Sequence, residues 1–383
     1  MTMTIDLSPV YDLEPRAFMT TPEVQGLEID RSDLRHTRII TLPERDLDDG
    51  EVRFRLDSFS FTSNNISYAL YGDRLKYWNF FPSGSHGWGR LPVWAFASVE
   101  DSMHPEFEPG ERFYGYFPMC GMHTLKPGAV SDGGFVDGAP HRENLPDFYN
   151  HYTRVSADPS YRADFENQQL LFRPLFLTAF LIDDQLGELN FHGADQIILT
   201  SASSKTAMAL AWLLRQRNVK VVGVTSRSGR AFAKNSQNYD DVILYDEVAD
   251  TLKTKSSVLL DFTGALDKVT QIHQLLGTHL KASYCIGCTH WDQAAPFPDV
   301  SAIPGPEPQF FVATRQGRKR IEEWGMRELQ RQITARLLEF YGPASGWIKA
   351  ARAIGADAVQ ECYDMVLASK TLPSEGYILS FDY

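Results

Sequence analysis

A turn of small polar residues joins a predicted strand to a predicted helix, and its residue types suit the binding of a phosphate group. Residues 197–200 are a short apolar run without alternation, typical of a parallel strand buried on both faces. A helical pattern at 203–217 and a second strand at 219–225 follow. Hydroxyl groups, a lysine and the first N–H groups of a helix all donate to phosphate oxygens. The candidate phosphate-binding residues are Ser201, Ser203, Ser204, Lys205 and Thr206.

The end of the second strand predicts which dinucleotide such a unit would bind. In a β–α–β dinucleotide-binding unit, the pyrophosphate lies at the helix N-terminus and the adenosine ribose at the end of the second strand. An acidic residue there favours a free ribose 2′-hydroxyl, whereas an arginine favours a 2′-phosphate. This sequence has Ser226 and Arg227 at that position and no acidic residue. It therefore predicts an NADP(H) site rather than an NAD(H) site.

The turn departs from the usual glycine pattern. The fingerprint Gly-x-Gly-x-x-Gly is absent, and residues 201–207 read Ser-Ala-Ser-Ser-Lys-Thr-Ala instead. Serine and alanine can replace glycine where the backbone needs no positive φ angle. A Walker A loop is excluded, because it needs glycine where this sequence has Ser204 and Leu199. The alternative is a doubly wound domain that keeps its fold and has lost its cofactor.

Length and charge narrow the class of protein. The 383 residues suit two domains, and the net charge of −12 argues against a nucleic-acid partner. The polar N-terminus and the lack of a long apolar run predict neither a signal peptide nor a membrane partner. A basic cluster is followed by two glutamates and favours a solvated helix face. The cluster comprises Arg315, Arg318, Lys319 and Arg320.

The cysteines and histidines do not predict a metal site. Cys285 and Cys288 have the spacing of a redox pair or of two zinc ligands, but no second pair follows them. They follow a predicted strand, in which alternation would place the two sulfur atoms on opposite faces, so a packing role is favoured. The histidines at 86, 104, 123 and 141 lack metal-ligand spacing, and solvated or capping roles are favoured for them. This cysteine usage fits a reducing cytoplasm.

The hydrophobic pattern changes near residue 165. Before it, the alternating residues 51–61 predict an antiparallel strand, and the glycine-, proline- and aromatic-rich residues 72–160 suit a β-barrel. After it, strands alternate with helices, which indicates a parallel sheet covered on both sides. The further predicted strands are 242–244, 258–261, 282–287 and 376–381. The other predicted helices are 170–186 (starting near Pro174), 230–235, 247–254, 265–276, 316–342 and 357–369.

The order and spacing of these pieces resemble the medium-chain dehydrogenase/reductase superfamily, in its zinc-free quinone and enoyl reductase branch. The sequence is most similar to an uncharacterised, DUF2855-type subgroup with a serine-rich turn. The matching pieces are strand 52–61 with an Asn-containing loop at 64–68, the Pro-Gly-Glu-Arg-Phe turn at 109–113, the Thr-Ala helix at 177–180, the Asp-x-x-Gly strand end at 261–264 and the helix at 358–370.

The resemblance implies an α/β fold with two domains. A GroES-like β-barrel domain at 1–165 would be completed by 345–383, and a doubly wound, Rossmann-type NADP-binding domain would span 166–344. The resemblance also implies a homodimer, formed through the sheet edge at 282–286. It implies further cofactor contacts at Asp261, Thr263 and Gly264.

The sequence departs from the zinc-dependent members, because it lacks their Gly-His-Glu motif and closely spaced cysteines. A hydrogen-bond donor would then polarise the substrate in place of a metal. The phenols of Tyr68 and Tyr77, and less strongly Tyr71, are candidates for that donor. Asn64 and Asn65 could hold the nicotinamide carboxamide or the substrate carbonyl. The alternative is that the tyrosines only pack the barrel.

Two functions are left open. One is a cytoplasmic NADPH-dependent, zinc-independent oxidoreductase that reduces an activated C=C or C=O compound of quinone, enone or enoyl type. The aromatic residues between 68 and 96 favour an apolar, aromatic or acyl carbonyl substrate for it. The other is a non-redox lyase or a nucleotide-binding regulatory protein on the same scaffold, because fold does not fix function.

Overall fold

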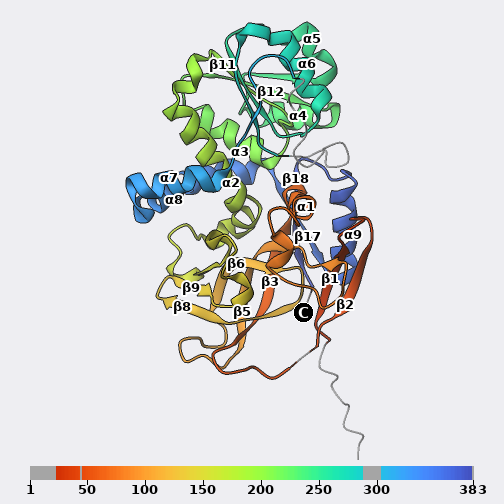
Figure 1. Ribbon diagram of the computed structural model, residues 1–383, viewed down its shortest axis with the longest axis vertical. Helices are drawn as coiled ribbons and strands as arrows, with labels where there is room; N and C mark the ends of the chain where they lie inside the picture. The colour runs from red at the N-terminus through yellow and green to blue at the C-terminus, as the bar shows by residue number, and fades with distance from the viewer. Residues whose placement is uncertain (1–22, 44, 288–302, 382–383) are drawn as a thin grey trace, which may run out of the picture.

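Two large sheets lie at opposite ends of the computed structural model, which describes residues 23–43, 45–287 and 303–381 (Figure 1). A six-stranded parallel sheet occupies one end, and a nine-stranded, mainly antiparallel sheet occupies the other. The long helix α2 (Glu166–Glu188) packs against elements of both parts. The chain therefore has an α/β fold with a β-rich N-terminal part, which confirms the predicted fold class.

The parallel sheet has the doubly wound strand order β13-β12-β11-β14-β15-β16. The order reverses between β11 and β14, and in such sheets a ligand binds outside the carboxyl ends of the strands at that point. The strands are β11 (Gln196–Leu199), β12 (Lys220–Thr225), β13 (Asp241–Leu244), β14 (Ser257–Asp261), β15 (Leu280–Cys285) and β16 (Gln309–Phe310). The helices beside them are η6 (Asn190–Gly193), α3 (Lys205–Leu214), α4 (Arg227–Asn235), η7 (Tyr245–Glu247), α5 (Val248–Thr251), α6 (Leu266–Leu276) and η8 (Gly277–His279).

The central strands of this sheet are buried on both faces. Ile197 and Leu199 of β11 belong to one hydrophobic cluster, whereas Ile198 belongs to the other. The first cluster also holds the apolar residues of α2 and α3, and the second holds those of α5 and α6. A strand with cores on both sides reads as an unbroken apolar run, which is why the sequence predicts β11 well.

The antiparallel sheet has the order β17-β18-β3-β5-β6-β10-β9-β8, with β7 paired to β3, and β2, β1 and β4 form a small separate sheet. The strands are β1 (Gln25–Asp30), β2 (Thr37–Thr41), β3 (Val52–Phe61), β4 (Trp88–Gly89), β5 (Pro92–Ser102), β6 (Arg112–Pro118), β7 (Met122–Leu125), β8 (Pro127–Ser131), β9 (Gly134–Asp137), β10 (His151–Arg154), β17 (Lys349–Ile354) and β18 (Glu375–Ser380). The short helices are α1 (Ser63–Leu70), η1 (Tyr77–Asn79), η2 (Pro140–Arg142), η3 (Asp147–Tyr149), η4 (Val155–Ala157) and η5 (Ala163–Phe165).

The C-terminal strand joins the N-terminal sheet. Strand β18 pairs antiparallel with β3, and helix α9 (Ala356–Leu367) packs against β1, β2 and β3. Strand β17, which the sequence does not predict, pairs in parallel with β18. The residue limits that we expect for the two domains, 1–165 with 345–383 and 166–344, stay a prediction.

Two predicted element boundaries are wrong. Helix α2 begins at Glu166, so Pro174 lies inside it rather than at its start. Burial of neighbours such as Leu171 and Phe172 offsets the lost hydrogen bond.

The expected Asn-containing loop is helix α1. Thr62 caps that helix, because its side chain accepts from a backbone N–H while Asn65 bonds back to the Thr62 backbone.

The predicted helix at 316–342 is two helices, α7 (Ala313–Trp324) and α8 (Met326–Trp347). They meet at Gly325, whose φ angle of 82° a helix cannot continue through. The predicted solvated basic face is also wrong for Arg320, which is buried against α2. Its guanidinium bonds to Asp184 at 2.6 Å and to Glu188 at 3.0 Å.

The expected dimer edge at 282–286 is partly covered by another strand. Residues Tyr284 and Cys285 of β15 pair with Gln309 and Phe310 of β16, so β16 is the outermost strand of this sheet in the part of the chain that is described. A homodimer stays a prediction.

Among the described residues, no helix combines the length and apolar character needed to cross a bilayer.

We predict that Gly223→Ala lowers the free energy of unfolding by about 1–3 kcal/mol through overpacking. A Cβ at Gly223 in β12 would lie 2.8 Å from the Ala202 Cβ and 2.8 Å from the Tyr239 ring. Chemical denaturation measures the change. The matched control is Gly342→Ala in α8, where a Cβ meets nothing within 4 Å and helix propensity favours alanine by about 1 kcal/mol. Equal effects of the two substitutions would contradict the close packing at Gly223.

Candidate functional site

The polar turn between β11 and α3 lies at the carboxyl edge of the sheet, where the strand order reverses. Ser201 adopts a left-handed backbone with a φ angle of 47°, so the condition under which serine replaces glycine without strain is not met at this residue. The Ser201 N–H donates to the Tyr245 hydroxyl at 2.7 Å, and the Ala202 N–H donates to the Val224 carbonyl at 3.1 Å. These two bonds hold the strained turn against the ends of β12 and β13.

Helix α3 presents free donors at its start. The Ser204 hydroxyl caps the helix by accepting from the Ala207 N–H at 3.4 Å. The N–H groups of Lys205 and Thr206 belong to the first turn and have no acceptor inside the helix. The Ser203 hydroxyl lies 3.2 Å from the Thr225 hydroxyl, at the end of β12. An anion at this helix start would therefore meet backbone N–H groups and several hydroxyls.

The Lys205 side chain turns away from the helix axis toward the other sheet. Its Nζ donates to the Glu375 carbonyl of β18 at 2.8 Å, and so connects the two parts of the fold. Burial lowers the pKa of the ammonium group to about 8, although the charge of Glu375 acts in the opposite direction. Because the Lys205 Nζ atom already bonds to Glu375, the predicted contact of Lys205 with a phosphate depends on its backbone N–H and on the attraction of its charge.

The loop after β14 is organised by a buried carboxylate. Asp261 is 1% exposed, and its oxygens accept from the Thr200 hydroxyl at 2.6 Å, the Thr263 hydroxyl at 2.7 Å and the Gly264 N–H at 2.9 Å. Gly264 has a φ angle of 71°, which glycine tolerates best. The side chains of Asp261 and Thr263 and the backbone N–H groups of Thr263 and Gly264 are therefore engaged within the protein.

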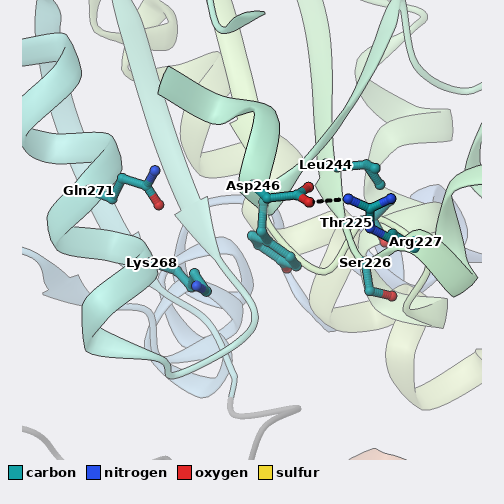
Figure 2. Close-up of a pocket in the computed structure, with 8 residues that line it drawn as sticks. Thr225, Ser226, Arg227, Leu244, Asp246, Lys268 and Gln271 are labelled. Carbon is teal, nitrogen blue, oxygen red and sulfur yellow. Dashed lines mark hydrogen bonds and ion pairs between the residues drawn. The ribbon is translucent and has the colours of Figure 1, made fainter. Parts of the chain in front are cut away.

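A pocket of about 390 Å³ opens beside the turn, at the ends of β12 and β13 (Figure 2). Asp246 points toward Arg227, and their charged groups form an ion pair of 2.5 Å, while Lys268 and Gln271 of α6 lie on the opposite side. The lining residues are Thr225, Ser226, Arg227, Leu244, Tyr245, Asp246, Lys268 and Gln271. Two predicted residues, Ser226 and Arg227, thus share a pocket with a lysine and a carboxylate that the sequence analysis did not select.

The predicted catalytic tyrosines are neighbours in the antiparallel part. The ring centroids of Tyr68 and Tyr77 are 4.6 Å apart, and the Tyr77 hydroxyl oxygen lies 3.1 Å from that of Tyr149. The Tyr68 hydroxyl hydrogen-bonds to Asn64 and to Tyr149. Burial raises the pKa of Tyr68, Tyr77 and Tyr149, so all three phenols keep their proton at neutral pH. Protonated phenols can donate to a developing oxyanion.

Two further tyrosines beside this cluster have unsatisfied hydroxyls. The Tyr116 ring centroid is 4.7 Å from that of Tyr149, and Tyr114 stacks on Trp94 at 5.6 Å. Within the described residues, the buried hydroxyls of Tyr114 and Tyr116 have no hydrogen-bond partner. A buried hydroxyl without a partner costs about 1–3 kcal/mol, so a water or a ligand atom at this place is favoured.

The two asparagines have different environments. The Asn65 side chain is buried and bonds to the backbone of Thr62 and to the Pro92 carbonyl, so both ends of its amide are engaged within the protein. Asn64 is half-buried and bonds to Tyr68. Of the two, Asn64 is the one placed beside a candidate donor.

The cysteines and histidines form no metal centre that the structure reveals. Cys285 is half-buried, and burial raises the pKa of its thiol to about 11; Cys288 lies outside the described residues. His104 accepts from the Glu106 N–H, and His141 bonds to the Phe80 carbonyl. In the described part of the chain, no three histidine, cysteine or acidic residues gather as metal ligands would. Independence of zinc stays a prediction.

Sequence reasoning missed the residues that reach these sites from distant segments. Tyr149 stands 72 positions after Tyr77, and Asp246 stands 19 positions after Arg227. The missed pocket residues Asp246, Lys268 and Gln271 follow strands β13 and β14. Their position just after strands of a parallel sheet is the signal that could have selected them, because the carboxyl ends of such strands share one edge.

Comparisons with known proteins agree with this geometry. The fold is shared by solved structures of a quinone oxidoreductase and an enoyl thioester reductase, the kinds of protein that the resemblance names. Residues 59–371 match the family described as "Protein of unknown function (DUF2855)", and the chain belongs to that family. No curated protein matches the sequence.

Solved structures share the fold at low sequence identity, so the likeness establishes the fold alone. CurA from Vibrio vulnificus in complex with NADPH is 13% identical with a TM-score of 0.58, and the match covers 94% of this chain and 99% of that one. Escherichia coli quinone oxidoreductase complexed with NADPH is 12% identical with a TM-score of 0.58 and the same coverage. A mutant enoyl thioester reductase from Candida tropicalis is 15% identical with a TM-score of 0.55, covering 94% and 100%.

We predict that the pH dependence of stability reports the buried Lys205. Its folded pKa of about 8 lies below the unfolded value of 10.5. Between these values the unfolded chain binds a proton that the folded chain lacks, so stability rises with pH. From pH 8 to 10, we expect the free energy of unfolding of the wild type to rise by about 2 kcal/mol relative to Lys205→Met.

Denaturant titrations at several pH values measure this difference. The matched control is Lys281→Met, since Lys281 also donates to a backbone carbonyl, at 3.1 Å, but is exposed. If the difference in the free energy of unfolding between the wild type and Lys205→Met did not change with pH, Lys205 would not be buried as a cation.

Proposed function

We propose that this protein is an NADP(H)-dependent, zinc-independent oxidoreductase that reduces an activated C=C or C=O compound of quinone, enone or enoyl type. The observation that carries the proposal is the pocket at the ends of β12 and β13. It brings Ser226, Arg227 and Lys268 together, and two of its lining residues, Thr225 and Tyr245, bond to the turn that precedes α3. Hydroxyls and two cations suit a ribose phosphate, and a helix start suits a pyrophosphate.

The residues present fit a dinucleotide. A Cβ at Gly229 would lie 2.4 Å from the Ser203 hydroxyl, so helix α4 approaches the turn as closely as glycine allows and keeps the two phosphate-facing segments together. In this proposal, the turn at 201–206 holds the pyrophosphate and Arg227 holds the 2′-phosphate. The loop backbone at Thr263 and Gly264 borders the nicotinamide end. CurA and the Escherichia coli quinone oxidoreductase, which share the fold, were both solved with NADPH.

The tyrosine cluster supplies the other half of the chemistry. Bound NADPH would supply a hydride, and the chain's own part is to hold the substrate and donate a proton or hydrogen bond to its oxygen. Tyr68 and Tyr77 stay protonated, and Asn64 and Tyr149 orient the Tyr68 hydroxyl. Aromatic rings surround these hydroxyls and limit water, which strengthens a hydrogen bond to a developing oxyanion. The same rings favour an apolar, aromatic or acyl carbonyl substrate.

The proposed setting is the cytoplasm, and the proposed assembly is a homodimer. The edge strand β16 carries Phe310, which is 42% exposed, and the nearby Val312 is 48% exposed. Apolar side chains at a sheet edge favour pairing with a second copy. Neither nucleic acid nor membrane is part of the proposal, because the net charge is −12.

We predict that Arg227→Ala weakens NADPH binding about tenfold and changes NADH binding less than threefold, because only NADPH carries the 2′-phosphate. The enhanced fluorescence of the bound nicotinamide measures both affinities. The matched control is Arg215→Ala, an arginine beside Asp240 that is outside the pocket. Unchanged NADPH affinity would contradict the 2′-phosphate role of Arg227. No response of the wild type to either cofactor would favour the non-redox alternative.

We predict that Tyr68→Phe or Tyr77→Phe lowers kcat about 100-fold on an accepted carbonyl substrate, with NADPH affinity unchanged, because the substitution removes one oxyanion donor. The rate of nicotinamide absorbance loss measures kcat. Tyr161→Phe is the control, since that phenol bonds to Glu166 outside the cluster. Full activity of both phenylalanine variants would exclude these tyrosines as the donor.

A further inference from the structure

The carboxylate of Asp246 occupies the same pocket as the arginine that would bind the 2′-phosphate. Asp246 lies in η7, just after β13. Its side chain points toward Arg227, which follows β12 (Figure 2). The two groups form an ion pair of 2.5 Å. Arg227 is 81% exposed and Asp246 is 56% exposed, so both charges face the solvent at the pocket mouth.

The other cations near the pocket also have carboxylate partners. Arg230 of α4 pairs with Glu247 at 2.9 Å, and Lys268 pairs with its neighbour Asp267 at 3.1 Å. Glu247 and Asp267 do not line the pocket, whereas Asp246 does. Asp246 is therefore the one carboxylate among the lining residues of this pocket.

We propose that Asp246 sets the nucleotide preference of this protein. Its carboxylate is the counterion that a 2′-phosphate must displace from Arg227, and it reduces the ratio of the affinities for NADPH and NADH. This inference rests on the proposed dinucleotide function. It goes further, because the end of β12 alone predicts a site that selects NADPH. With Asp246 in place, the pocket accepts both dinucleotides.

The effect of Asp246 is electrostatic. An ion pair this exposed is weak, so a 2′-phosphate displaces the carboxylate from Arg227 with little loss. The displaced carboxylate stays attached to η7, close to the bound phosphate, and two anions at that range repel each other. NADH carries a 2′-hydroxyl in place of the 2′-phosphate, and a carboxylate accepts a hydrogen bond from a hydroxyl. Asp246 therefore disfavours NADPH and favours NADH.

The test is Asp246→Asn, which keeps the shape of the side chain and removes its charge. Fluorescence titration gives the Kd for NADPH and for NADH, and calorimetry with 2′,5′-ADP and 5′-AMP isolates the adenosine end. We expect the wild type to bind both dinucleotides with affinities within about 30-fold. The substitution should shift the Kd ratio about tenfold toward NADPH, which corresponds to about 1.4 kcal/mol. The ratio for 2′,5′-ADP over 5′-AMP should shift in the same direction.

Glu247→Gln is the matched control, because it removes the same charge one residue away, outside the pocket, and should change the ratio less than threefold. In the Arg227→Ala background, Asp246→Asn should still favour NADPH, since the repulsion acts on the phosphate itself. An unchanged ratio in Asp246→Asn, or an equal shift in Glu247→Gln, overturns the role of Asp246. Wild-type protein that binds none of the four nucleotides overturns the proposed function as well, and so the two failures are distinguishable.

Discussion

The buried carboxylate of Asp261 is the constraint on which the candidate site depends. It ends β14 and bonds to the Thr200 hydroxyl at the end of β11, so it ties together the two strands between which the order of the sheet reverses. The Thr200 hydroxyl in turn accepts from the Phe262 N–H at 2.8 Å. A carboxylate without water must satisfy its oxygens within the protein, and here the loop 263–264 does so. These bonds therefore hold the ends of β11 and β14 and the loop after β14 in place.

A lysine connects the parallel sheet with the antiparallel part. The Lys205 ammonium reaches from the start of α3 to a carbonyl of β18, and β18 pairs with β3, which leads directly into helix α1 with its candidate donors. A buried cation bonded to one carbonyl is incompletely compensated, and burial lowers its pKa for that reason. An anion at the helix start would restore the favourable environment of this charge. The link between the two parts of the fold and the binding of an anion thus involve the same side chain.

Sequence reasoning succeeded where one segment alone determines the outcome. The unbroken apolar run of β11 and the polar start of α3 are local patterns, and the doubly wound sheet follows from their repetition. It failed where distant segments determine the outcome. Gly325 divides a helix that periodicity alone would continue, and Arg320 is buried because α7 packs on the acidic residues of α2. The tyrosine cluster and the Arg227–Asp246 pair also join separate elements, so the sequence does not show which of their residues meet.

In the proposed function, the serine-rich turn would bind a phosphate without the glycine fingerprint. A glycine turn leaves its N–H groups to the ligand, whereas here the hydroxyls already bond to one another or to the helix start, as Ser203 does with Thr225 and Ser204 with Ala207. An incoming phosphate would exchange these bonds for its own, so the turn would contribute less net free energy to binding than its number of donors indicates. In the proposed function, the charges at the far end of the dinucleotide would then decide more of the affinity, and Arg227, Lys268 and Asp246 would have a larger influence than beside a glycine turn.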